Sequence, residues 1–98
     1  MAEIIWTNTA VECLQGIFDY IAADSPSAAH RVVVGIDTKI QLLQGSPRLG
    51  QRYEAIVDRE VREILYGHYR IAYLLQSETR IQILGIYHGA MDIDRYLQ

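Results

Sequence analysis

The strongest constraint on the fold is a change in hydrophobic period between the two halves of the chain. From residue 10 to residue 43, apolar side chains recur every three or four positions, as on one face of an α-helix. From residue 61 to residue 88 they alternate with a period of two, as in a β-strand. Because 98 residues have room for about one hydrophobic core, we expect residues 1–98 to form a single α+β domain.

Capping signals place the first helix close to the N-terminus. Thr7 or Thr9 offers an N-cap, and Thr9 with Glu12 has the spacing of a capping box. The apolar stripe behind these residues consists of Ala10, Leu14, Ile17, Phe18 and Ile21. The pattern predicts a helix over residues 8–22.

A second helix follows after a short break. Ser25 and Pro26 are typical of an N-cap and a first helical turn, and Gly45 followed by Pro47 is typical of a helix end. Its apolar stripe consists of Ala29, Val32, Val33, Ile36, Ile40 and Leu43. The signals predict a helix over residues 26–44. Since only a few residues join the two helices, they must form an antiparallel hairpin.

The rest of the predicted structure is a sheet. Strands are predicted over residues 4–6, 61–66, 69–76 and 80–88, with tight turns at Gly67-His68 and Ser77-Glu78. The last two strands are apolar on both faces, which favours central positions. The order β-αα-βββ predicts an N-terminal helical hairpin packed on one face of a mainly antiparallel four-stranded sheet.

Composition narrows the class of protein. The net charge of −3 argues against a dedicated nucleic-acid binder, because phosphate neutralisation needs a basic excess. Cys13 is the sole cysteine, so no intrachain disulfide can form, which suits a reducing cytoplasm. The sequence lacks a signal peptide, the ~20-residue apolar run of a membrane span, and metal-ligand spacing or a phosphate loop. We therefore expect a cytoplasmic protein with no membrane contact, metal or cofactor.

Several stretches occur together in one order along the chain. They are Trp6 with Ala10, Tyr20-Ile21-Ala22, Ser25-Pro26-x-x-Ala29, Leu43-x-x-x-Pro47-x-x-Gly50, Arg62-Glu63-Ile64-x-Tyr66-Gly67-x-Tyr69-Arg70-Ile71-x-Tyr73 and Ile83-x-x-Ile86-x-His88-Gly89-Ala90. This ordered set resembles the RelE/ParE toxins of bacterial type II toxin–antitoxin modules, over nearly the whole chain. The resemblance implies the fold predicted above and an antitoxin whose disordered segment wraps the toxin.

The family has two branches with different targets. Membership of the RelE branch would imply an mRNA endonuclease that acts on the ribosome. Membership of the ParE branch would imply a protein that binds and poisons DNA gyrase. At positions where the resemblance would place nuclease cations, this chain has Val61, Glu63 and Met91. Those side chains cannot stabilise phosphate charge in a cleavage reaction, so they count against the nuclease branch.

Individual residues carry two interpretations each. Arg70 matches an arginine that touches phosphate in the nuclease branch, but an ion pair with Glu63 or a helix acid is the favoured interpretation. His88 and Tyr96 would complete a nuclease site with Arg70, although a lone histidine at a strand end is more often structural. Tyr87 shares its strand face with Ile81 and Ile83 by simple alternation, which indicates a core residue.

The length of the hairpin and the Ser25-Pro26 joint are more similar to the ParE branch. The resemblance therefore implies a toxin, of the kind that stabilises plasmids, that binds DNA gyrase and is neutralised by a cognate antitoxin, forming a hetero-oligomer. We expect no sequence-specific nucleic-acid binding and no catalytic residue. The expected partner-binding residues are Arg62, Arg70, His88, Met91 and Tyr96. The alternatives are a ribosome-dependent mRNA endonuclease and a non-toxic remnant that binds only its antitoxin. The acidic pI of about 5.5 fits either a weakened or inactive toxin or a target contact that does not resemble nucleic acid.

Overall fold

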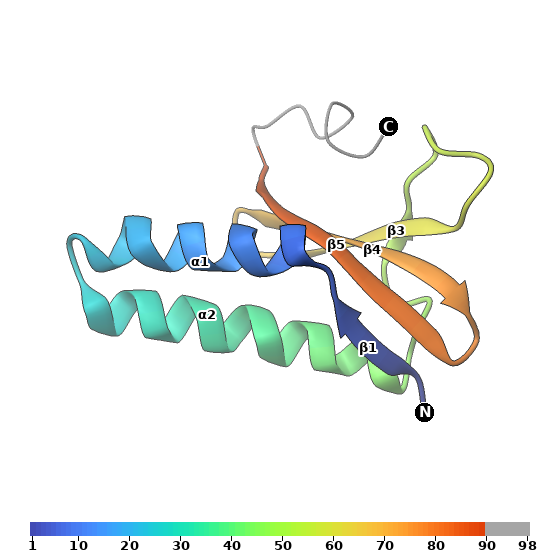
Figure 1. The fold of residues 1–98 in the computed structure, drawn as a ribbon, viewed down its shortest axis with the longest axis horizontal. Helices are drawn as coiled ribbons and strands as arrows, with labels where there is room; N and C mark the ends of the chain where they lie inside the picture. The colour runs from blue at the N-terminus through green and yellow to red at the C-terminus, as the bar shows by residue number, and fades with distance from the viewer. Residues whose placement is uncertain (90–98) are drawn as a thin grey trace.

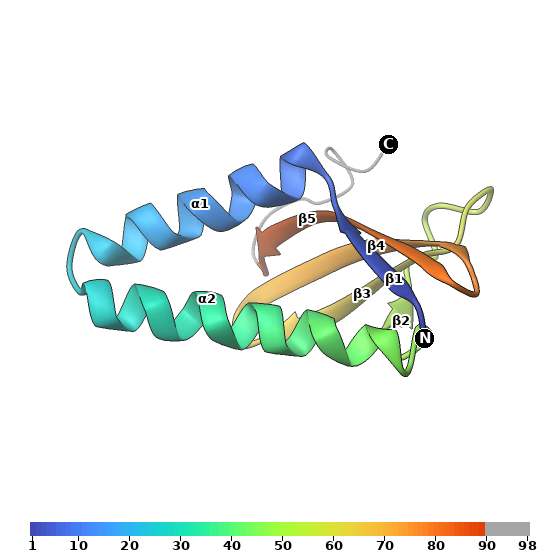
Figure 2. The same ribbon diagram turned by 60° about the horizontal axis from the view of Figure 1, so that its bottom comes forward.

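The computed structural model describes residues 1–89, in which two helices pack on one face of a five-stranded sheet (Figures 1 and 2). The elements are β1 (Glu3–Trp6), α1 (Asn8–Ala22), α2 (Pro26–Gln41), a 3-10 turn (Leu42–Gln44), β2 (Gln51–Arg52), β3 (Val61–Tyr66), β4 (Tyr69–Ser77) and β5 (Arg80–His88). The strand order is β1-β5-β4-β3-β2, with β1 parallel to β5 and all other pairs antiparallel. The predicted α+β class and the central positions of β4 and β5 are confirmed.

Side-chain caps set the starts of both helices. The Thr7 hydroxyl oxygen accepts a hydrogen bond from the Ala10 N–H at 3.1 Å and donates to the Ile83 carbonyl at 2.7 Å. It therefore caps α1 and ties it to β5, and the predicted capping box of Thr9 with Glu12 is wrong about the cap residue. Ser25 caps α2 as predicted, by accepting from the Ala28 N–H.

The sheet has one strand more than predicted. β2 is only two residues long and pairs Gln51 with Glu63 of β3. Its position follows from Tyr73, whose buried hydroxyl accepts from the Gly50 N–H at 2.9 Å and donates to the Pro47 carbonyl at 2.8 Å. These two bonds hold the chain beside β3 at the point where β2 begins.

A bulge in β5 changes which face Tyr87 occupies. Tyr73 pairs with Ile83, whereas the preceding residue of β4, Ala72, pairs with Gly85, so Leu84 is an extra residue in the ladder. Consecutive β4 residues point to opposite faces, and their partners in β5 do the same. Tyr87 is buried as predicted, but it lies on the face opposite to Ile83.

The two faces of the sheet carry separate clusters of buried side chains. The larger cluster lies between the helices and the sheet and includes Ala2, Ala10, Ile36, Ile40, Leu43, Ile64, Ile71, Tyr73, Leu75, Ile81, Ile83 and Ile86. The smaller one consists of Ile56, Val61, Ala72 and Tyr87, so the loop before β3 covers part of the second face. Gly85 lets the Tyr87 ring lie flat along β5, because a Cβ there would meet that ring.

The helical hairpin extends well past the ends of the strands, so its tip has no sheet beneath it (Figures 1 and 2). The Tyr66 ring at the end of β3 lies against Gly35 in the middle of α2, where a Cβ would collide with the phenol. Cys13 of α1 is half-buried and packs against residues of both clusters. Within residues 1–89, neither helix is long and apolar enough to cross a lipid bilayer.

Candidate functional site

Arg70 of β4 is held by a carboxylate from the neighbouring strand. Its Nε and Nη2 atoms donate to Oε2 of Glu63 at 3.0 and 2.7 Å, and about a fifth of each side chain is exposed. Glu63 lies diagonally across the β3–β4 ladder from Arg70, on the same face. The ion-pair interpretation of Arg70 is confirmed, and the guanidinium has its charge compensated within the chain.

His88 ends β5 and lies close to the turn between β3 and β4. Its ring is 6.2 Å from the His68 ring, centroid to centroid, and meets the Tyr69 ring edge-on at 6.1 Å. An open hollow beside it is lined by Glu63, Leu65, Gly67, His68, Arg70, His88 and Gly89. The structure thus brings Arg70 and His88 to one hollow, together with the carboxylate that neutralises Arg70. Across residues 1–89, no three His, Cys, Asp or Glu side chains gather closely enough to hold a metal ion.

Arg62 lies elsewhere and belongs to a network of charges. Its Nε donates to Oε2 of Glu60 at 2.8 Å, and its Nη1 donates to the Gly50 carbonyl at 2.7 Å. Arg48 joins the same Glu60 at 3.1 Å and also binds Glu78. The hydrogen bond from Arg62, reinforced by Arg48, holds the pKa of the Glu60 carboxyl below its usual value despite partial desolvation. This network stabilises the loop between α2 and β3.

Arg62 and Arg70, both expected to bind the partner, lie on opposite faces of the sheet. Arg62 pairs with Tyr73, whereas Arg70 pairs with Leu65, and positions 62 and 65 point to opposite sides. Arg62 and Arg70 therefore cannot contact a partner through one face of the sheet, and their expected roles in partner binding stay predictions. Val61 is fully buried in the smaller cluster, so it offers nothing to a substrate. Met91 and Tyr96 lie outside the described residues.

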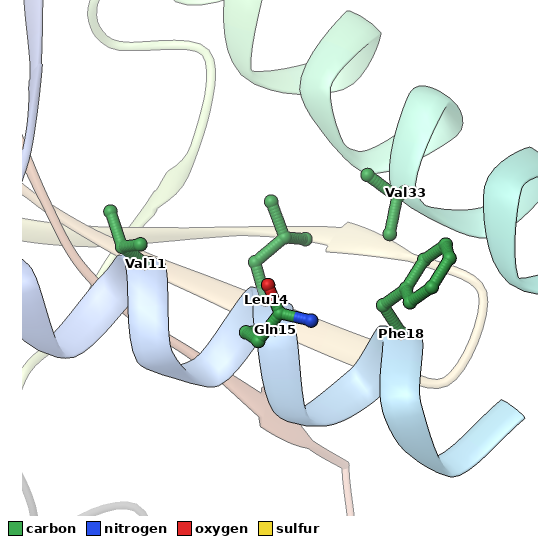
Figure 3. A pocket seen from close by; sticks show the side chains of 5 residues that line it. All are labelled: Val11, Leu14, Gln15, Phe18 and Val33. Atoms are coloured by element: carbon green, nitrogen blue, oxygen red, sulfur yellow. The ribbon is translucent and has the colours of Figure 1, made fainter. Parts of the chain in front are cut away.

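The hairpin carries an apolar groove that the sequence analysis did not identify. It is lined by Val11, Leu14, Gln15 and Phe18 of α1 and Val33 of α2, as Figure 3 shows. Leu14, Phe18 and Val33 were assigned to the core-facing stripes, yet they are only half-buried. One residue of the sequence does indicate this groove. Val11 is apolar but lies outside the predicted stripe, so it widens the apolar surface of α1 beyond the side that faces the sheet.

Comparisons with known proteins give consistent matches along the chain. A family model described as the ParE toxin of the type II toxin–antitoxin system parDE matches residues 4–93. The chain is 32% identical over 90 residues to Toxin RelE2 of Caulobacter vibrioides, an alignment that covers 92% of this chain and 98% of that toxin. Its fold is similar to a chain of the chromosomal ParDE TA system from P. aeruginosa, with a TM-score of 0.72 and 25% identity. That match covers 90% of this chain and 96% of the other.

Proposed function

The chain belongs to the ParE toxin family of type II toxin–antitoxin systems, and we propose that it acts by binding and inhibiting DNA gyrase rather than by cleaving RNA. A cognate antitoxin then neutralises it by covering apolar surface of the hairpin and an edge of the sheet, in a toxin–antitoxin hetero-oligomer. Extended or helical segments commonly bind such edges and grooves.

The ion pair between Arg70 and Glu63 carries the argument against RNA cleavage. A nuclease of this fold needs a cation that faces the scissile phosphate and strengthens its contact in the transition state. Here the guanidinium donates two hydrogen bonds to a carboxylate oxygen 2.7 and 3.0 Å away. A phosphate would have to displace that carboxylate and would then be repelled by it. The buried Val61 supplies no substitute charge.

The similarity to a protein named Toxin RelE2 is the reason to keep mRNA cleavage as the second candidate. His88 borders the same hollow as Arg70, so a histidine and an arginine do lie within reach of one ligand. In this second candidate function the substrate would be ribosome-bound mRNA. The side chains of the hollow that could act as a general base are Glu63, His68 and His88.

Two assays on the purified protein separate the candidates. In a supercoiling assay with gyrase, we expect inhibition by the toxin that disappears when the co-expressed antitoxin is added. In a translation reaction, we expect intact mRNA. Cuts within codons of translated mRNA, with unaffected supercoiling, would overturn the proposal, and a protein inactive in both assays would support the non-toxic remnant.

Substitutions at the hollow sharpen this test. For a nuclease, His88→Ala should lower the cleavage rate about 10²–10³-fold. For a gyrase inhibitor, His88→Ala should leave supercoiling inhibition close to that of the unmodified protein. The double variant Glu63→Gln/Arg70→Gln removes both charges of the pair together, so it avoids leaving one of them uncompensated.

A further inference from the structure

Two histidines that are far apart in the sequence meet at one end of the sheet. His68 lies in the turn between β3 and β4, His88 is the last residue of β5, and both side chains are exposed. Their ring centroids are 6.2 Å apart, and the ring planes differ by 25°. Spacing along the chain does not reveal this pair, because the two residues become neighbours only through the β4–β5 ladder.

The backbone holds the two histidines side by side. Tyr69, which follows His68, pairs with His88 across the β4–β5 ladder. The His68 carbonyl accepts a hydrogen bond from the Gly89 N–H at 2.7 Å. The positive φ of Gly67, 58°, fits the two-residue turn that carries His68. Both imidazoles therefore extend from neighbouring main-chain positions that the sheet has already fixed.

The distance between the rings suits a shared metal ion. An imidazole nitrogen binds Zn²⁺ at about 2.0–2.1 Å, which places the ring centroid about 3.2 Å from the ion. Two rings can therefore share one ion at centroid separations up to about 6.4 Å, and a tetrahedral angle at the ion gives about 5.2 Å. The observed separation of 6.2 Å lies within the upper limit. Rotation about the torsions of two exposed side chains supplies the remaining ~1 Å.

The charges around the pair allow a divalent cation to approach. The hollow beside the pair has a volume of about 620 Å³ and is bordered by Glu63 and Arg70. An uncompensated arginine would repel a cation, but Oε2 of Glu63 is 2.7 Å from Nη2 of Arg70 and offsets its charge. Apart from the two histidines, the other lining residues are one leucine and two glycines, which carry no charge.

The ligand type selects the class of metal. Imidazole nitrogen suits Zn²⁺, Ni²⁺ and Cu²⁺, whereas Mg²⁺ and Ca²⁺ take oxygen ligands. Residues 1–89 bring no third His, Cys, Asp or Glu into a metal-binding group with the pair. A tetrahedral ion held by two imidazoles therefore keeps two positions for water, so it exchanges with solvent more readily than an ion in a four-ligand structural site.

We propose that His68 and His88 form a binding site for one Zn²⁺, Ni²⁺ or Cu²⁺ ion, which completes its coordination with water. The ion joins the β3–β4 turn to the end of β5. It stabilises the folded chain, because the unfolded chain does not hold the two imidazoles together. The inference rests on the positions of the two histidines and is independent of the target of the toxin.

Calorimetric titration of the 98-residue chain, without an affinity tag, with ZnCl₂ tests the site. We expect one Zn²⁺ per chain. His68→Ala and His88→Ala should each weaken binding at least about 10-fold, since even the loss of a residue that supports a ligand commonly costs about 10–100-fold. His30→Ala is the matched control, because His30 is an exposed histidine of α2 that does not line the hollow. An equal loss in His30→Ala, or no loss in His68→Ala, would overturn the inference.

Thermal denaturation gives a second measurement on the same variants. We expect ZnCl₂ to raise the Tm of the unmodified protein and of His30→Ala. The Tm of the double variant His68→Ala/His88→Ala should not change with ZnCl₂. MgCl₂ at the same concentration should leave every Tm unchanged, because Mg²⁺ binds oxygen ligands. A rise with ZnCl₂ that persists in the double variant, or an equal rise with MgCl₂, would assign the effect to other groups and overturn the inference.

Discussion

In the sheet and its loops, Arg48, Arg62 and Arg70 each bind a carboxylate at 3.1 Å or less, whereas within residues 1–89 no residue of α1 or α2 takes part in an ion pair. The hairpin also keeps an open apolar groove, whereas a loop covers part of the second face of the sheet. The sheet half therefore uses its charged and apolar groups for its own stability. The hairpin leaves both kinds available, which is why the proposed function assigns apolar surface of the hairpin to the antitoxin.

The largest expected effect tests how strongly the sheet half depends on Tyr73. Tyr73→Ala removes a fully buried ring and both hydrogen bonds to the loop, so we expect the free energy of unfolding to fall by about 3–5 kcal/mol. Urea denaturation followed by circular dichroism measures it.

The matched control for Tyr73 is in the hairpin. Tyr20 is 83% exposed on α1, and Tyr20→Ala should change the free energy of unfolding by no more than about 0.5 kcal/mol. Equal losses from the two substitutions would contradict the division between a self-stabilised sheet and an available hairpin.

A pair of glycines tests the joint between the two halves. At Gly35 an added Cβ would collide with the Tyr66 ring, so Gly35→Ala should destabilise the protein by about 1–3 kcal/mol. At Gly16 of α1 nothing lies within 4 Å of the added atom, so Gly16→Ala should stabilise by about 0.5–1 kcal/mol through helix propensity. Thermal denaturation of both variants gives the two signs, and a stabilising Gly35→Ala would mean that Tyr66 does not fix α2.

The pH dependence of stability should reveal the Glu60 network. The hydrogen bond from Arg62 lowers the pKa of Glu60 in the folded protein, so the ionised carboxylate stabilises the fold above the unfolded-state pKa of about 4.3. That contribution is lost as the pH falls from this value through the lower folded-state pKa. Glu60→Gln should lower stability by about 1 kcal/mol at pH 7 and flatten the loss below pH 4.3.

Asp37→Asn is the control for that experiment, since Asp37 is a carboxylate of the hairpin with no ion pair within residues 1–89. Its urea midpoint should follow the same course with pH as that of the unmodified protein. A flattened acid limb in Asp37→Asn as well would show that the hairpin carboxylates also stabilise the fold.

The smallest expected change in stability belongs to the groove. Val11→Ser removes a half-exposed side chain, so the free energy of unfolding should change by no more than about 0.5 kcal/mol. Binding of the antitoxin, which the proposed function places on apolar surface of the hairpin, should nevertheless weaken measurably. A loss of stability above about 1 kcal/mol would place Val11 in the core instead of at a partner surface.

Much of the fold was predictable because its signals are local. Ser25, Pro26 and the two-residue turn at Gly67 are short-range features, and Gly67 has the positive φ of 58° that such a turn favours. The Leu84 bulge was not predictable, because it depends on how β5 fits against β4. β2 was missed for a related reason: its two residues pair only because Tyr73, more than twenty positions away, holds Gly50.

The site was predicted less well than the fold. The Arg70–Glu63 pair was anticipated because cross-strand neighbours of opposite charge commonly meet. The opposite faces of Arg62 and Arg70 also follow from the alternation of side chains through the turn that pairs Tyr66 with Tyr69. The groove could not be predicted from the apolar stripes of the two helices, because hydrophobic periodicity does not show how far a hairpin extends past its sheet. The gyrase target and the roles of Met91 and Tyr96 remain predictions.

Because the hairpin extends past the sheet, a small change of angle at its base produces a larger displacement at its tip. Helix α1 has 15 residues, so it is about 22 Å long. A tilt of about 5° at its base would move its tip by about 2 Å. The Thr7 hydroxyl lies at that base, and the Tyr66–Gly35 contact holds the middle of α2. Substitutions at these two positions would therefore change the direction of the hairpin tip without altering any residue exposed there.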